Sequence, residues 1–260
     1  MNALARHRRH PAAIALLLLL GLIFTGTAYS ALAPKAATAA EASADQVNEG
    51  HQLFLTNCAT CHGTGALGTT KGPNLAGVGA ASVDFQMSTG RMPMAGPGVQ
   101  APRNAVTFTP EKIAAISAYV ASLAPGPAIP DDKYTQATGD AGRGGEIFRT
   151  NCSMCHNSAF AGGALTRGKY APSLSHGDVG RIIYEAMLTG PQSMPVFNDT
   201  NLSPQAKADV ITYLMTMRDE GNPGGMALGS LGPVPEGLVA WIFGLGVLIG
   251  GAYWLAQKGA

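Results

Sequence analysis

A chain of 260 residues is long enough for one or two domains with additional segments. Its formal net charge is +1 and only 13% of its residues are charged, so no strongly basic field indicates a nucleic-acid partner. Glycine and proline are plentiful, with 34 and 17 copies, but they follow no period, which excludes a collagen-like chain.

The N-terminal end combines a basic flank with an apolar run. Three arginines within the first ten residues precede a hydrophobic stretch from about Ala12 to Ala33. This layout is typical of an export signal, and Ala28-Tyr29-Ser30 offers a small-x-small cleavage site. The run is also long enough to span a bilayer if it is not cut. We therefore predict that residues 1–33 are a signal peptide or an N-terminal membrane anchor, followed by a tether at 34–44 and an exported chain.

A helix is predicted directly after this tether. Asp45 is a suitable N-cap, and Gly50, Phe54 and Cys58 recur at every fourth residue, so they share one face. A glycine inside a helix costs about 1 kcal/mol relative to alanine. Its presence suggests that another backbone approaches Gly50 closely.

Cys58-Ala59-Thr60-Cys61-His62 has the pattern of a c-type haem attachment site. Each thiol adds to one vinyl group of the porphyrin, and the short spacing brings both sulfurs to one edge of the ring. The next residue then lies under the iron. We therefore predict that Cys58 and Cys61 bind a haem covalently and that His62 is the proximal iron ligand.

The sixth ligand of this iron is expected among the methionines that follow. A thioether raises the reduction potential, which suits electron transfer at the high end of a respiratory chain. Met92 is our choice because Met-Pro recurs in the second half of the chain, and Met94 is the rival. Methionine is otherwise a common core residue, and this is the expectation for those in predicted helices: Met87, Met187, Met215 and Met217.

A further helix is predicted from Thr109-Pro110-Glu111. Threonine is its cap, proline takes the first helical position and glutamate complements the positive end of the helix. Pro125-Gly126-Pro127 ends it. The expected buried stripe consists of Ile113, Ile116, Tyr119, Val120 and Leu123.

The same pattern returns after a short linker at 126–139. Cys152-Ser153-Met154-Cys155-His156 repeats the attachment motif, and the two copies use all 4 cysteines of the chain. We predict that Cys152 and Cys155 bind a second haem, with His156 as its proximal ligand. The flanking residues also repeat, in the pairs Gly50 and Gly144, Phe54 and Phe148, Pro73 and Pro172, Met92 and Met194, and Tyr119 and Tyr213.

These matches predict two copies of one haem-binding domain, at 45–125 and 140–220, with Met194 as the second axial methionine. One competing interpretation is a pair of zinc half-sites that form one cysteine-rich site, but zinc does not need a histidine directly after each cysteine pair. His51 and His176 are further exported histidines that in principle allow a bis-histidine iron. Both are expected at the surface, because His51 lies on the wrong side of the attachment loop and His176 lies in a polar turn.

The C-terminal end predicts a membrane anchor. Residues 221–235 are rich in glycine and proline and indicate a flexible tether. Residues 236–257 form a predominantly apolar span with Trp241, Tyr253 and Trp254 toward its ends, which is typical of a transmembrane helix. Several glycines thin one side of this helix, so we expect it to pack against another membrane helix. A buried core helix is the alternative.

Each half of the chain resembles a class I c-type cytochrome domain. The shared features are a Gly-x-x-x-Phe helix leading into Cys-x-x-Cys-His, a Pro-x-Leu loop, a Met-Pro loop and a final helix with a tyrosine. The resemblance implies an all-α fold of two tandem class I cytochrome c domains, besides the N-terminal hydrophobic segment and the C-terminal transmembrane helix. In that family the proline carbonyl hydrogen-bonds the ligand imidazole, which implies supporting roles for Pro73 and Pro172.

The whole chain resembles the di-haem cytochrome c (cytochrome cc) subunits of the actinobacterial menaquinol–cytochrome c reductase, the cytochrome bc complex. The resemblance covers nearly the full length and depends on the order of segments and on Thr89-Gly90-Arg91-Met92-Pro93. It implies three protein partners: a cytochrome b subunit, a Rieske iron–sulfur subunit and a haem-copper terminal oxidase. It also implies a cell-membrane location with the haem domains on the outer side and the C-terminus in the cytoplasm.

The function implied by this resemblance is electron transfer alone. One haem accepts an electron from the Rieske cluster and the other passes it to the oxidase, in an order that stays open, while the partner subunits carry out the quinol chemistry. Both axial positions are filled, so no catalytic residue is expected. The alternatives are a di-haem subunit of another membrane-bound periplasmic dehydrogenase or oxidase, and a ligand-binding haem sensor, which needs a vacant sixth site.

Overall fold

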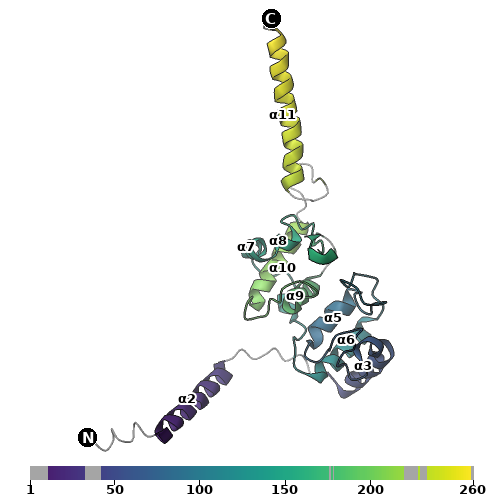
Figure 1. Ribbon diagram of the computed structural model, residues 1–260, viewed down its shortest axis with the longest axis vertical. Coiled ribbons are helices and arrows are strands. Elements are labelled where there is room, and N and C mark those ends of the chain that lie inside the picture. Colours follow the sequence, from purple (N-terminus) through teal and green to yellow (C-terminus); the bar gives the residue numbers. More distant parts are fainter. Residues whose placement is uncertain are drawn as a thin grey trace, which may run out of the picture. The chain divides into compact units, whose positions relative to one another are not determined.

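The computed structural model is predominantly helical (Figure 1). It describes residues 11–32, 42–175, 177, 179–219, 228 and 233–258. The chain divides into two compact units, Met1–Thr38 and Ala39–Ala260. The predictions for the basic flank, for His176 and for most of the two tethers lie outside the described residues.

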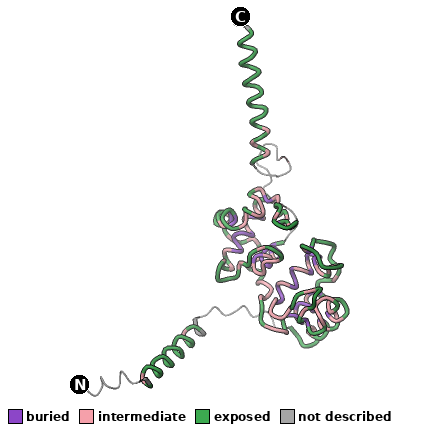
Figure 2. Tube along the Cα trace, viewed as in Figure 1, coloured by how far each residue is buried: buried purple, intermediate pink, exposed green. Residues whose placement is uncertain are grey.

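The first unit contains α2, Pro11–Leu32. Its stretch Ala12–Tyr29 has a mean hydropathy of 2.1 and is long and apolar enough to cross a membrane, with no part of it buried (Figure 2). The hydroxyl groups of Thr25 and Thr27 donate to the carbonyls of Gly21 and Ile23, so these two polar groups are satisfied within the helix. The helix fits both of the roles expected for residues 1–33.

The first helical domain is formed by α3 (Ala44–Asn57), α4 (Ala59–His62), α5 (Gly79–Ser88) and α6 (Pro110–Leu123). Its helices enclose one apolar core, and the side chains buried there include Phe54, Val83, Met87, Ile113, Ile116, Tyr119 and Val120. Four of the five residues of the expected stripe on α6 are buried, and Leu123 is half-buried.

The start of α3 differs from the prediction. Ser43, and not Asp45, is the N-cap, because its hydroxyl accepts a hydrogen bond from the backbone N–H of Gln46 at 3.2 Å. Asp45 instead lies in the first turn, where its charge complements the positive end of the helix.

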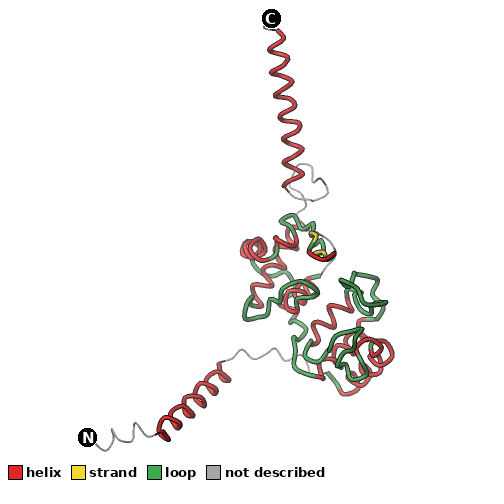
Figure 3. The backbone as a smooth tube through the Cα atoms, in the orientation of Figure 1, coloured by secondary structure: helices red, strands yellow, loops and turns green. Residues whose placement is uncertain are grey.

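The second helical domain is formed by α7 (Ala141–Asn151), α8 (Ser153–His156), α9 (Gly180–Thr189) and α10 (Pro204–Asp219). Between α8 and α9 lie two short strands that were not predicted from the sequence, β1 (Gly163–Ala164) and β2 (Tyr170–Ala171), joined by the 3-10 turn η2 (Thr166–Gly168). The strands pair antiparallel, with Gly163 opposite Ala171 and Ala164 opposite Tyr170 (Figure 3).

Both domains use a glycine where their first and last helices cross. A Cβ atom on Gly50 would collide with the carbonyl oxygen of Ala115 on α6, and one on Gly144 would collide with that of Asp209 on α10. The predicted close approach of a backbone to Gly50 is therefore confirmed, and the repeat extends to Gly144.

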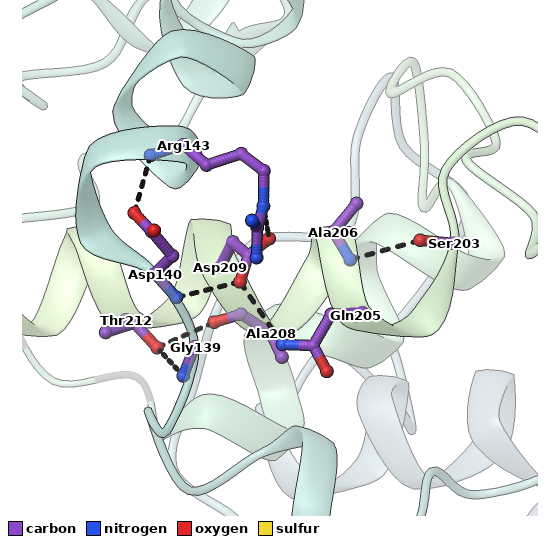
Figure 4. Close-up of polar contacts among 9 residues, drawn as sticks. All are labelled: Gly139, Asp140, Arg143, Ser203, Gln205, Ala206, Ala208, Asp209 and Thr212. Atoms are coloured by element: carbon purple, nitrogen blue, oxygen red, sulfur yellow. Dashed lines mark hydrogen bonds and ion pairs between the residues drawn. The ribbon is translucent and has the colours of Figure 1, made fainter.

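A polar cluster fixes the start of α7 against α10 in the second domain (Figure 4). The Asp209 side chain, which is fully buried, accepts hydrogen bonds from the Asp140 backbone N–H, from Arg143 Nε and from Gln205 Nε2. Burial disfavours the charged form of Asp209, but these donors outweigh it and leave the pKa of the carboxyl below its ordinary value.

The two helical domains also contact each other. Helix α5 packs against α9, and Arg181 forms an ion pair with Asp84 at 3.3 Å. The predicted linker at 126–139 is packed as well: it contains η1 (Asp132–Tyr134), which contacts both α9 and α10.

The C-terminal helix α11 spans Pro233–Lys258. Within it, Val234–Gln257 has a mean hydropathy of 1.9, and none of this stretch is buried (Figure 2). That exposure contradicts the alternative of a buried core helix and agrees with a membrane span. The helix starts before residue 236, so the end of the predicted tether is helical.

Candidate functional site

The two attachment motifs have the same backbone geometry. Helix α3 ends at Asn57, and the next residue, Cys58, is both the C-cap of α3 and the N-cap of the short helix α4. The carbonyl of Cys58 accepts from the backbone N–H groups of Cys61 and His62, at 3.1 and 3.0 Å. A residue three positions further along a helix lies on the same side, so both sulfurs face one direction.

The second motif repeats this arrangement closely. Cys152 caps α7 and begins α8, and its carbonyl accepts from the N–H groups of Cys155 and His156 at 3.2 and 2.9 Å. Each motif is therefore a single helical turn that starts where a longer helix ends.

Each motif histidine makes a hydrogen bond that sets its tautomer. His62 Nδ1 lies 2.8 Å from the Pro73 carbonyl oxygen, and His156 Nδ1 lies 3.0 Å from that of Pro172. A carbonyl only accepts hydrogen bonds, so Nδ1 carries the proton and Nε2 keeps its lone pair. Histidines that ligate metals usually donate their other ring N–H in this way.

Burial keeps the second histidine neutral. It lowers the pKa of His156, and the bond to Pro172 only partly opposes this effect. A neutral imidazole is the form that binds iron.

Loop contacts hold these prolines in place. The backbone N–H of Leu75 donates to the Ala66 carbonyl, and that of Leu174 donates to the Phe160 carbonyl, both at 2.8 Å. In the first loop, a Cβ atom on Gly72 would come within 3.1 Å of His62 Cε1, so the backbone itself lies against the ring.

The proposed methionine ligands lie next to the motifs. Met194 lines a cavity together with Cys152, Cys155 and His156, so the structure brings all four predicted residues of the second site together. In the first domain, Met92 packs against the same core cluster as Cys58, whereas Met94 is half-buried and is not among the residues packed on that cluster.

The positions of the other methionines and of His51 agree only in part with the predictions from the sequence. Met87 and Met187 are core residues as predicted, and Met215 packs against the second core, but Met217 is 40% exposed, so that prediction is wrong. His51 is half-buried rather than at the surface, because its ring stacks on Tyr119 at a centroid distance of 4.7 Å.

The chemistry of the cavity in the second domain fits a haem. Two thiols, an imidazole with a free Nε2 lone pair and a thioether meet in a space whose other walls are mostly apolar, which suits a flat apolar macrocycle. The first domain also contributes to these walls, through Phe85, Arg91 and Gln100, which was not predicted from the sequence. The only available signal was an arginine directly before Met92.

The cysteines do not resemble those of a redox or zinc site. Burial, with a smaller contribution from the second cysteine of each pair, raises the pKa of the Cys58 and Cys152 thiols to about 11. Redox-active Cys-x-x-Cys motifs instead have lowered thiol pKa values. Within the described ranges, no group of three or more His, Cys, Asp or Glu side chains is placed to hold a metal ion.

Comparisons with known proteins agree with this geometry. A family model described as "Cytochrome c" matches residues 47–124, and one described as "Cytochrome C oxidase, cbb3-type, subunit III" matches residues 139–214. Relatives named "Cytochrome bc1 complex cytochrome c subunit" cover nearly the whole chain. The one from Mycobacterium tuberculosis is 44% identical over 93% of this chain and 89% of its own length. The one from Mycobacterium leprae is 44% identical over 94% and 87%, and that from Corynebacterium efficiens 40% over 97% and 91%.

Proposed function

The chain belongs to the family of actinobacterial cytochrome bc1 complex cytochrome c subunits, and from this membership we propose that it relays electrons through two covalently bound haems. Membership indicates a membrane-associated electron-transfer role, and the two candidate spans fit a membrane anchor. The number of haems, their ligands and the partners on either side belong to the proposal.

The proposed sites follow the repeated motifs. Cys58 and Cys61 would hold the first haem, and His62 and Met92 would supply the ligands of its iron, in a domain at 45–125. The corresponding residues of the second site, in a domain at 140–220, are Cys152, Cys155, His156 and Met194. A bound haem supplies one-electron cycling between Fe(III) and Fe(II).

The chain's own residues orient and insulate these groups. The carbonyls of Pro73 and Pro172 fix the histidine tautomers, and the cysteine turns hold one edge of each ring. A haem bound by both the histidine and the methionine of a site would have no iron position left for a substrate, and we therefore propose a subunit without substrate chemistry of its own. The observation that carries the proposal is the pair of matching Cys-x-x-Cys-His turns, each with its histidine bonded to a proline carbonyl.

The proposed path continues the role implied by the family. The electron comes from a Rieske iron–sulfur subunit that works with a cytochrome b subunit, and it leaves toward a haem-copper terminal oxidase. The haem domains lie on the outer side of the membrane and the end of α11 in the cytoplasm, while residues 1–33 are a signal peptide or a second anchor.

The test is purification of the full chain in mild detergent through a C-terminal tag, with haem quantified per chain. We expect two haems c in the wild type, and one in a variant with Cys152→Ala and Cys155→Ala. The matched Ser153→Ala variant changes the same turn without removing a thiol and should keep both. Unchanged haem content in the double cysteine variant would contradict the two-haem proposal.

The second candidate is a di-haem cytochrome c subunit of another membrane-bound complex, either a periplasmic dehydrogenase or an oxidase. The match of residues 139–214 to the cbb3-type subunit III model favours it. The span α11 follows the haem domains, whereas di-haem subunits of one oxidase class usually carry their anchor before them. Co-purification distinguishes the two candidates. Co-purification of cytochrome b and a Rieske protein supports the proposal. If oxidase or dehydrogenase subunits co-purify without cytochrome b and a Rieske protein, the proposal is overturned.

A further inference from the structure

The cavity of the second domain is partly closed by the first domain. Helix α5 and the segment that follows it contribute Phe85, Arg91 and Gln100 to the cavity walls. Since α5 packs against α9, which provides Ile182, Ile183, Ala186 and Met187 to the same walls, these contributions come from a packed interface.

Hydrogen bonds hold the contributing segment on the second domain. The Gln100 side chain accepts from the Tyr170 backbone N–H and donates to the Tyr170 carbonyl, both at 2.9 Å, so it pairs with β2 like a neighbouring strand. The backbone N–H of Ala101 donates to Gln192 Oε1 at 3.1 Å. Gln192 lies two residues before Met194 and lines the cavity as well.

Arg91 is the cation that this arrangement places at the cavity. It is only 9% exposed, and its guanidinium lies 5.0 Å from the centre of the Phe85 ring. Its backbone N–H donates to the Gln86 carbonyl at 2.9 Å, which fixes the chain at the end of α5. Among the described residues that line the cavity, Arg91 is the one Arg or Lys, and none is Asp or Glu.

We infer that Arg91 of the first domain binds the propionate carboxylates of the haem held by the second domain. This inference rests on the proposed second haem. The propionates are the anionic groups of an otherwise apolar macrocycle, and a guanidinium fork matches a carboxylate in geometry and charge. A positive charge near a haem favours its reduced form, so Arg91 also raises the potential of the second haem and makes that potential depend on domain contact.

The test compares Arg91→Gln with Arg181→Gln in the full-length, haem-loaded protein. Arg181 joins the same two domains through Asp84 but does not line the cavity, so its variant loses the same charge at the same interface. Two quantities are measured: the midpoint potential of each haem by redox titration, and the propionate bending bands by resonance Raman spectroscopy. Met194→Ala identifies the titration wave of the second haem.

We expect Arg91→Gln to lower the midpoint potential of the second haem and to shift its propionate bands, while Arg181→Gln leaves both near wild type. The charge-transfer band of methionine-ligated ferric haem should keep its full wild-type intensity, to which both haems contribute, because Met92 beside Arg91 is undisturbed. Arg91→Lys keeps the charge but not the fork, so it should retain most of the potential and still shift the bands.

Equal effects of the two glutamine variants, or unchanged bands in both Arg91 variants, overturn the inference. If Arg91→Gln does not fold, the Arg91→Lys bands decide alone. Haem content distinguishes a failure of this inference from a failure of the proposed function. If the chain binds two haems but the Arg91 variants do not change the second haem, only the inference is refuted. If no haem is attached to Cys152 and Cys155, the proposed function itself is refuted.

Discussion

Single side chains decide what a c-type haem site does once the cysteines have attached the ring. The hydrogen bond from His156 Nδ1 to the Pro172 carbonyl leaves the Nε2 lone pair available to bind a metal in the cavity of the second domain. The Met194 side chain lines the same cavity. Thioether ligation favours the reduced iron and fills the position that a gas would take. In the proposed second site, Met194 is therefore the residue that would distinguish an electron relay from a ligand sensor.

Met194→Ala should lower the midpoint potential of the second haem, because the thioether that favours Fe(II) is gone. It should also open this iron to carbon monoxide, from none bound to about one per reduced chain. Redox titration and difference spectra with carbon monoxide measure both effects. Met217→Ala is the matched control, since Met217 is 40% exposed in the same domain. A variant with wild-type potential and no carbon monoxide binding shows that Met194 is not the ligand.

At the level of elements, each haem domain depends on the crossing of its first and last helices. On α7, a Cβ atom added to Gly144 would meet the Asp209 backbone and the Cβ atom of Tyr213, and the same helix ends at the attachment turn. A displaced α7 would therefore move Cys152 as well. Space at this crossing controls both stability and the geometry of the haem site.

Gly144→Ala should destabilise the second domain by about 1–3 kcal/mol, because an added methyl group must push α7 away from α10. Gly142→Ala is the matched control in the same helix: its Cβ atom would meet only the Asp140 side chain, at 3.2 Å, and alanine favours helix by about 1 kcal/mol. Denaturant unfolding followed through the haem absorbance measures the difference. Equal stability of the two variants would show that the crossing tolerates the methyl group.

The sequence predicted these elements well because their signals are local. The glycine–phenylalanine spacing before each motif, and the Thr-Pro-Glu start of α6, depend on neighbours within a few turns. The N-cap was misplaced because Ser43 and Asp45 are both good caps, and the tertiary position of the helix decides between them. Met217 was misassigned for a related reason: its helix was predicted correctly, but its exposed face was not.

At the scale of the whole molecule, the repeat indicated two domains but contained no information on how they contact each other. The docking of Gln100 on β2 and the presence of Arg91 at the second cavity join residues that lie far apart in sequence. Such contacts need a chain fold before they can be identified. The strands β1 and β2 were missed because two residues each are too short for an alternating pattern.

The domain contact also buries a carboxyl group. Glu185 on α9 is fully buried and faces Asp84 of α5, which is 4% exposed, while Arg181 pairs with Asp84. Burial, followed by the charge of Asp84, raises the pKa of Glu185 to about 10, with Arg181 opposing in part. The folded chain therefore keeps a proton on Glu185 that the unfolded chain loses near its ordinary pKa of 4.5.

The sign of the pH dependence follows from this difference. Between these two pKa values only the folded state holds the proton. The contribution of Glu185 to the free energy of unfolding is therefore complete below the lower pKa, and it declines as pH rises toward the upper pKa. The decline is up to about 1.4 kcal/mol per pH unit. Glu185→Gln mimics the protonated group and should remove this decline, which makes the variant more stable than wild type at about pH 9. Denaturant unfolding at several pH values measures it, with exposed Glu146→Gln as the control. If Glu185→Gln keeps the wild-type slope, the buried carboxyl does not hold a proton at the contact between the two haem domains.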